Sequence, residues 1–146
     1  MNGQQGTKRI ILVILTVYTA LMVYWMFFGF GREVHTIYRY NFLPLRTIMA
    51  FMRGDGPTTW DIAVNICGNI GVFVPYGLLF ASYYGCELRK SLPVFLTGLL
   101  TAEVLQLATK KGVFDVDDIL LNTAGFFVGH VIYSVYRKSG DQRHIK

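Results

Sequence analysis

Long apolar stretches alternate with short polar ones along the chain. Four of them come close to the roughly 20 residues that a helix needs to cross a bilayer: Ile10–Phe30, Ile62–Tyr84, Leu92–Ala108 and Ile119–Tyr136. Because this number is even, both termini are expected on one side of the membrane. The pattern predicts an all-α integral membrane bundle of four transmembrane helices, formed by residues 1–146 as a single domain.

The connection between the first and second stretches is predicted to be an amphipathic interfacial segment. Arg39, Arg46 and Arg53 recur every seven residues among apolar side chains, which is typical of a segment lying on a membrane surface. Asn41 and Pro44 argue against one continuous helix there. Two interpretations stay open: a linker on the lipid, or a lid over the outer face whose Arg46 contacts a phosphate or carboxylate.

Composition agrees with a membrane protein. Hydrophobic residues make up 53% of the chain and charged residues 16%, against roughly 25% charged residues in an average soluble domain. The two cysteines, Cys67 and Cys86, are about 28 Å apart on a helix, too far for a disulfide, and they match no zinc-site spacing. We therefore expect no metal and no cofactor.

The net charge of +5 is explained by basic residues beside the apolar stretches, so no nucleic-acid partner is expected. These residues flank the first stretch, the loop between the second and third, and the end of the fourth: Lys8, Arg9, Arg89, Lys90, Arg137, Lys138, Arg143 and Lys146. By the positive-inside rule these flanks are cytoplasmic, which predicts that both termini face the cytoplasm.

Three polar pairs interrupt the apolar stretches: Asn65 and Asn69, Glu103 and Gln106, and Asp118 and Asn122. The members of each pair are three or four residues apart and therefore share a helix face. A carboxylate near the bilayer centre costs roughly 2.5–3.5 kcal/mol. Since consecutive helices alternate in direction, all three pairs fall within about 10–15 Å of the outer face by helix rise. This coincidence predicts a polar pocket beneath the first connection.

The same residues have structural interpretations. Glu103 can be hydrogen-bonded to the asparagines, and the asparagines can hold helices together. Asp117 or Asp118 can cap the last helix and complement its dipole.

Glycines in two of the stretches are expected to allow close helix packing. Gly68 and Gly71 belong to the second stretch, and Gly125 and Gly129 form a Gly-x-x-x-Gly step in the fourth. The step in the fourth stretch can serve a homo-oligomer or packing within the chain, and we favour packing within the chain.

Two function classes follow from the polar pocket. The first is a non-enzymatic envelope protein that binds an amphiphile, such as a membrane lipid, a lipoglycopeptide or a lipid-linked wall precursor. The second is a membrane enzyme whose carboxylates hold a divalent cation or act as a general base. A transport role would require oligomerisation because four spans are few for a conduit. The candidate polar-core residues are Asn65, Asn69, Glu103, Gln106, Asp115, Asp118 and Asn122; the lid or interface residues are Asn41, Pro44 and Arg46.

The motifs follow one another in a specific order. They are Asn41-Phe-Leu-Pro44-Leu, Asn65-x-x-Gly-Asn69-x-x-x-Phe73-x-Pro75-x-Gly77, Glu103-x-x-Gln106 and Phe114-Asp115-x-Asp117-Asp118-x-x-x-Asn122-x-x-Gly125-x-x-x-Gly129. Over about residues 38–133 the chain resembles the VanZ-like family. The resemblance implies a multi-pass protein of the bacterial cell membrane. It also implies a link to glycopeptide resistance, since the family's namesake is associated with low-level teicoplanin resistance.

One position departs from the family pattern. The family usually has an arginine about two residues before the first aspartate of the last motif, where this chain has Val113. Either Lys110 or Lys111 takes the role of that arginine, or the role is absent from this chain.

Overall fold

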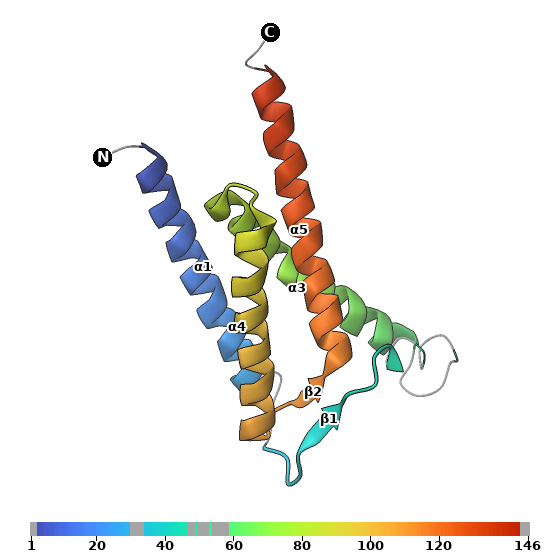
Figure 1. The fold of residues 1–146 in the computed structure, drawn as a ribbon. Coiled ribbons are helices and arrows are strands. Elements are labelled where there is room, and N and C mark those ends of the chain that lie inside the picture. Colours follow the sequence, from blue (N-terminus) through green and yellow to red (C-terminus); the bar gives the residue numbers. More distant parts are fainter. Residues whose placement is uncertain (1–2, 30–33, 47–48, 50–52, 54–58, 144–146) are drawn as a thin grey trace.

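The computed structural model describes residues 3–29, 34–46, 49, 53 and 59–143. Among these residues, four long helices form a bundle: α1 (Gly3–Phe28), α3 (Thr59–Tyr84), α4 (Leu88–Thr109) and α5 (Val116–Arg143). Each is long and apolar enough to cross a membrane. The start of α1 and the end of α5 lie at the same end of the bundle (Figure 1). The predicted all-α bundle of four spans is confirmed.

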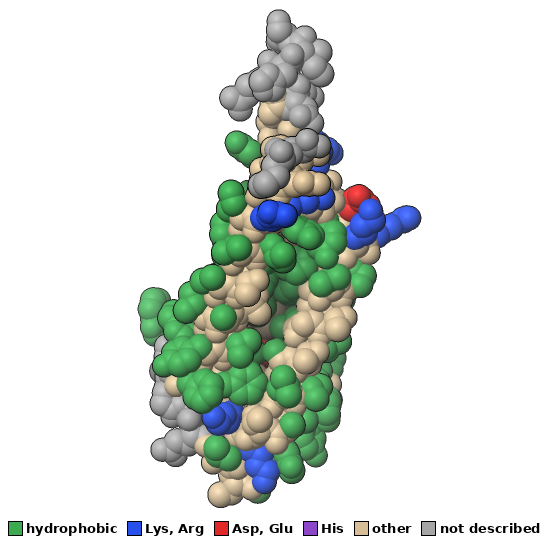
Figure 2. Space-filling model, turned by 90° about the vertical axis from the view of Figure 1, so that its left-hand side faces the viewer, with side chains coloured by type: hydrophobic (Ala, Val, Ile, Leu, Met, Phe, Trp, Pro, Cys, Tyr) green, Lys and Arg blue, Asp and Glu red, His purple; other side chains and the backbone are tan. Residues whose placement is uncertain are grey.

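The outer surface of the bundle is apolar, as a lipid-facing surface must be. Side chains such as Ile10, Val13, Val104 and Val131 each expose half or more of their surface. In Figure 2 hydrophobic side chains cover the middle of the face shown, and Lys and Arg lie toward its two ends. This band of apolar surface between basic ends is the arrangement expected of a multi-pass membrane protein.

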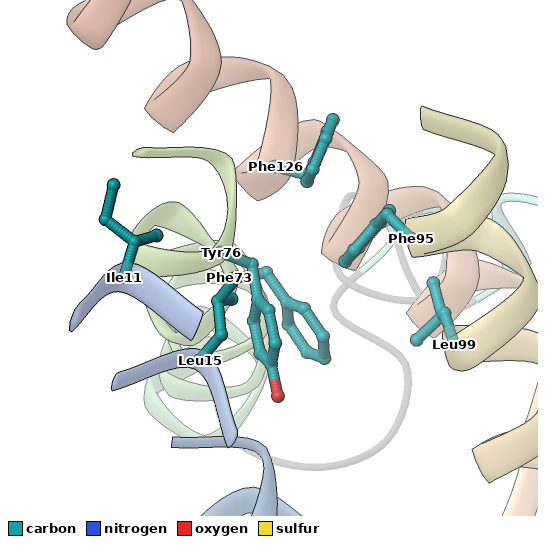
Figure 3. Packing of buried hydrophobic residues seen from close by; sticks show 7 residues of the cluster. All are labelled: Ile11, Leu15, Phe73, Tyr76, Phe95, Leu99 and Phe126. Atoms are coloured by element: carbon teal, nitrogen blue, oxygen red, sulfur yellow. The ribbon is translucent and has the colours of Figure 1, made fainter. Parts of the chain in front are cut away.

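Aromatic rings fill the centre of the bundle. Phe126 is fully buried, and its ring stacks on Phe95 of α4 with centroids 4.3 Å apart. Phe73 and Tyr76 of α3 contact Phe95 as well. Figure 3 shows these rings between the helices, with Leu15 approaching from α1. The rings connect α3, α4 and α5 in one core.

The closest helix contact, between α3 and α5, depends on glycine. A Cβ atom at Gly125 would lie 2.2 Å from the carbonyl oxygen of Ile70, and one at Gly129 would lie 2.0 Å from that of Val74. The Gly-x-x-x-Gly step therefore packs within the chain. Gly77 of α3 makes the reciprocal contact, since its Cβ would lie 2.0 Å from the carbonyl oxygen of Phe126.

The expectation of close packing at Gly68 and Gly71 is wrong. A Cβ atom at either position would meet no atom of the described residues within 4 Å. Both face open space because α5 approaches the other side of α3, through the face that carries Gly77.

Short strands tie the first connection to the start of α5, a feature that the sequence did not predict. Strand β1 (Arg39–Asn41) pairs in parallel with β2 (Val113–Asp115). The backbone N–H of His35 also donates to the carbonyl of Lys110, which ends α4 in a left-handed conformation. These contacts place the first connection beside the polar end of the bundle.

The expected interruption near Asn41 and Pro44 is confirmed, because a strand and a turn lie there. Arg46, Met49 and Arg53 are helical, whereas residues 47–48, 50–52 and 54–58 lie outside the described residues. Tyr38, Tyr40, Phe42 and Leu43 of this connection are exposed beside Arg39 and Arg46. Exposed apolar and basic side chains together give the connection its amphipathic surface.

Candidate functional site

A cavity of about 280 Å³ opens between the four helices at the end opposite the termini. It is lined by Met22, Trp25 and Met26 of α1, by Val64, Asn65, Gly68, Asn69, Val72 and Phe73 of α3, by Glu103 and Gln106 of α4, and by Asp118 and Asn122 of α5. All three predicted polar pairs meet here. The alternating helix directions bring these pairs to one depth, although the chain separates them by many residues.

Asn69 links two of the polar pairs. Its Nδ2 donates to Oδ1 of Asp118 at 2.7 Å and lies 3.3 Å from Oδ1 of Asn65, one turn earlier in α3. A single amide thus joins α3 to the first turn of α5. The asparagines were expected to hold helices together, and Asn69 does so through this contact. The same contact orients the Asp118 side chain at the wall of the cavity.

The α4 pair is the most deeply buried. Glu103 is 2% exposed and Gln106 is 5% exposed. Gln106 donates through Nε2 to the backbone carbonyl of Met26 at 3.1 Å, which fixes the last turns of α1 against α4. Glu103 therefore presents a carboxylate to the cavity from within the membrane-spanning bundle, where such a group is energetically expensive and marks a functional candidate.

Asn122 adds a buried acceptor. The residue is 3% exposed, and its Oδ1 has no hydrogen-bond partner among the described residues. Buried polar atoms are nearly always hydrogen-bonded in proteins. An amide oxygen in this position can accept a hydrogen bond from a group that enters the cavity.

Asp115 has a different position from the other predicted polar-core residues, because it does not line the cavity. Its Oδ1 accepts hydrogen bonds from Nδ2 of Asn41 at 3.1 Å and from the backbone N–H of Asp117 at 2.9 Å. The second bond is an N-terminal cap on α5. The cap that was expected from Asp117 or Asp118 is therefore supplied by Asp115.

Asp117, which is 1% exposed, accepts a hydrogen bond from the backbone N–H of Leu45. Together with the bond between Asn41 and Asp115, this contact holds the turn that contains Pro44 against the start of α5. None of Asn41, Pro44 and Arg46 lines the cavity, and Arg46 is exposed. Asn41 and the turn that contains Pro44 thus lie against the start of α5 and outside the cavity lining.

The contribution of α1 was not predicted. Met22, Trp25 and Met26 line the cavity, and no ionisable side chain or amide among them distinguishes them in the sequence from lipid-facing residues. With Val64 and Phe73 they make one part of the wall apolar. The cavity therefore combines an apolar surface with buried amide and carboxylate groups.

The two lysines near Val113 lie away from the cavity lining. Lys110 Nζ is 3.3 Å from the backbone oxygen of Thr36 and lies over the ring of Tyr38. Lys111 lies over the ring of Phe28. In the part of the chain that the structure describes, no three His, Cys, Asp or Glu side chains are grouped closely enough to hold a metal ion.

A family model described as VanZ/LLP1 matches residues 12–137, which include every residue of the cavity lining. The chain belongs to the VanZ-like family. Among curated proteins, Protein VanZ of Enterococcus faecium is 22% identical over 133 residues, which cover 90% of this chain and 78% of that protein. No solved structure matches this VanZ-like chain. It is a multi-pass membrane protein of that family.

Proposed function

We propose that this VanZ-like protein binds an amphiphile in the cavity and thereby contributes to teicoplanin-type glycopeptide resistance or a related function of the bacterial cell envelope. One observation carries the proposal. Six predicted polar residues meet the apolar wall of α1 and α3 around a single cavity inside the membrane bundle. The match to Protein VanZ of Enterococcus faecium supports the envelope setting.

The size of the cavity decides which part of a ligand enters it. At about 280 Å³ it is close to the lower limit of small-molecule sites, roughly 300 Å³. A whole glycopeptide is far larger. We infer that the cavity takes the junction between an acyl chain and its polar head. The acyl chain then contacts Trp25 and Phe73. The head group donates hydrogen bonds to Glu103, Asp118 and Asn122.

The orientation in the membrane follows from the basic flanks. With both termini cytoplasmic, the cavity opens toward the outer leaflet, where a membrane-anchored drug would be met. Cys86 lies in the connection between α3 and α4, on the termini side. In a Cys67→Ser background, a membrane-impermeant maleimide is expected to label Cys86 only after permeabilisation. Labelling in intact cells would contradict this orientation.

Drug susceptibility in a sensitive Gram-positive host tests the proposed function. Wild type is expected to raise the inhibitory concentration of teicoplanin and to leave that of vancomycin, which lacks the acyl chain, unchanged. Glu103→Gln should lose this protection because it removes the buried carboxylate with little change of shape. Glu87→Gln is the matched control, since Glu87 lies at the other end of the bundle.

Membrane levels of all variants are matched by blotting. Absence of protection by well-expressed wild type would reject teicoplanin resistance as the task of this protein. Equal protection by wild type and Glu103→Gln would reject the role of the cavity carboxylate.

One observation favours an alternative function, a carboxylate- or metal-dependent membrane enzyme acting on a lipid-linked envelope substrate. Glu103 and Asp118, from different helices, both line the cavity. Two carboxylates at one site can divide the roles of acid and base. Turnover of a lipid-linked wall precursor by purified protein, lost in Asp118→Asn, would establish the enzyme. Unchanged precursor after prolonged incubation would reject it.

A further inference from the structure

A second, larger hollow lies at the opposite end of the bundle from the cavity. It has a volume of about 720 Å³ and is formed by the first turns of α1, the connection between α3 and α4, and the last turns of α5. Along α1, Lys8 at this hollow is roughly 26 Å from Trp25 at the cavity by helix rise. The two are separate sites, and the proposed function makes no use of this one.

The hollow is basic. Lys8, Lys90 and Arg137 line it together with one carboxylate, Glu87, so positive charges exceed negative ones by two. Glu87 is 2.7 Å from Nζ of Lys90. Lys8 and Arg137 thus supply the surplus charge. They come from α1 and α5, which both contribute residues to the lining. Figure 2 shows basic side chains above the apolar band at this end.

The turn between α3 and α4 shapes one wall. Gly85 and Cys86 both have positive φ, at 66° and 67°, so the chain reverses within three residues. A Cβ atom at Gly85 would lie 3.4 Å from a guanidinium nitrogen of Arg137, which places that group against the turn. Helix α4 begins after this turn. The side chain of its N-cap residue, Glu87, makes no capping hydrogen bond to the first turn of the helix. The positive end of the helix dipole adds to the basic potential.

The hollow also has the surroundings of a membrane interface. Tyr83, Tyr84 and Tyr133 line it beside Ile11, which belongs to the apolar core cluster. The ring of Tyr83 lies 5.7 Å from Nζ of Lys8. Tyrosine rings are enriched at the level of lipid head groups, and basic pockets between transmembrane helices bind anionic head groups.

We propose that this hollow binds the phosphate of an anionic phospholipid from the leaflet on the termini side. Lys8 and Arg137 hold the phosphate, while the tyrosines and Ile11 contact the glycerol and the upper acyl chain. A soluble phosphate anion would use the same cations but would leave this apolar wall unused.

Native mass spectrometry of the delipidated full chain in neutral detergent tests the proposal. Dioleoyl phosphatidylglycerol is titrated against dioleoyl phosphatidylcholine, and inorganic phosphate is the soluble competitor. The lining double variant combines Lys8→Gln and Arg137→Gln. The control double variant combines Arg9→Gln and Lys138→Gln. The second pair removes the same charge from adjacent residues that do not line the hollow.

Wild type is expected to prefer phosphatidylglycerol. The lining double variant should bind it roughly tenfold to thirtyfold more weakly, whereas the control double variant should stay close to wild type. An equal loss in both double variants, or no preference between the two lipids, would overturn the site. Displacement of the lipid by an equal concentration of inorganic phosphate would overturn the assignment to a phospholipid.

Discussion

Three aspartates lie within four residues at the start of α5, and each has a different partner. Asp115 caps the helix and bonds Asn41, Asp117 accepts from the backbone N–H of Leu45, and Asp118 accepts from Asn69 at the cavity. The sequence predicted a cap from Asp117 or Asp118, although one helix cap does not need three acids. It could not show which acid takes which role, because that depends on the strand pairing and on the side of α5 that faces α3.

We predict that Asp115→Ala destabilises the protein by about 1–3 kcal/mol, through loss of the cap and of the bond to Asn41. Asp115→Asn keeps an acceptor oxygen at the same place and should lose less. Thermal unfolding in detergent measures both variants. Equal midpoints for wild type and Asp115→Ala would contradict the assigned role.

Glycine contacts bring α3 and α5 closer together than any other pair of helices described. The Gly-x-x-x-Gly step in the fourth stretch predicted close packing, and Gly125 and Gly129 do meet the α3 backbone. The same reasoning failed for Gly68 and Gly71. A pattern of small residues indicates a helix face that another helix can approach closely. Whether a helix packs there depends on where the partner helix lies.

Gly129→Ala is predicted to separate α3 from α5, because the new Cβ would lie 2.0 Å from a backbone oxygen that cannot move alone. Overpacking of a core typically costs about 1–3 kcal/mol, so the melting temperature should fall clearly. Gly98→Ala, on α4, is the control because its Cβ meets nothing within 4 Å. A melting temperature that is the same for both variants would argue against this contact.

The four spans and their alternating directions were predictable from the apolar stretches alone. The depth of the polar pairs also followed, since helix rise and direction fix it. The pairing of β1 with β2 was not predictable, because each strand has three residues and the two are far apart in the chain. The part of the cavity wall formed by α1 was not predictable for a different reason. Residue types such as Met22 and Trp25 occur both on lipid-facing surfaces and in cavity linings, so the sequence does not distinguish the two positions.

Across the whole molecule, polar and charged groups are divided between two ends. One end holds the cavity, with its carboxylates and amides. The other carries both termini and the basic hollow. An apolar band separates the two ends, so each end lies at a different leaflet. We propose that the cavity takes the polar junction of an acylated ligand.

Direct binding to the purified protein tests that claim with two glycine variants. Gly68 lines the cavity, Gly71 does not, and both have open space beside them on the same helix. Wild type should bind teicoplanin more tightly than the same glycopeptide without its acyl chain. Gly68→Leu should fill the cavity and weaken teicoplanin binding strongly, and Gly71→Leu should bind as wild type does. Equal binding by the two variants, or no advantage from the acyl chain, would contradict the account.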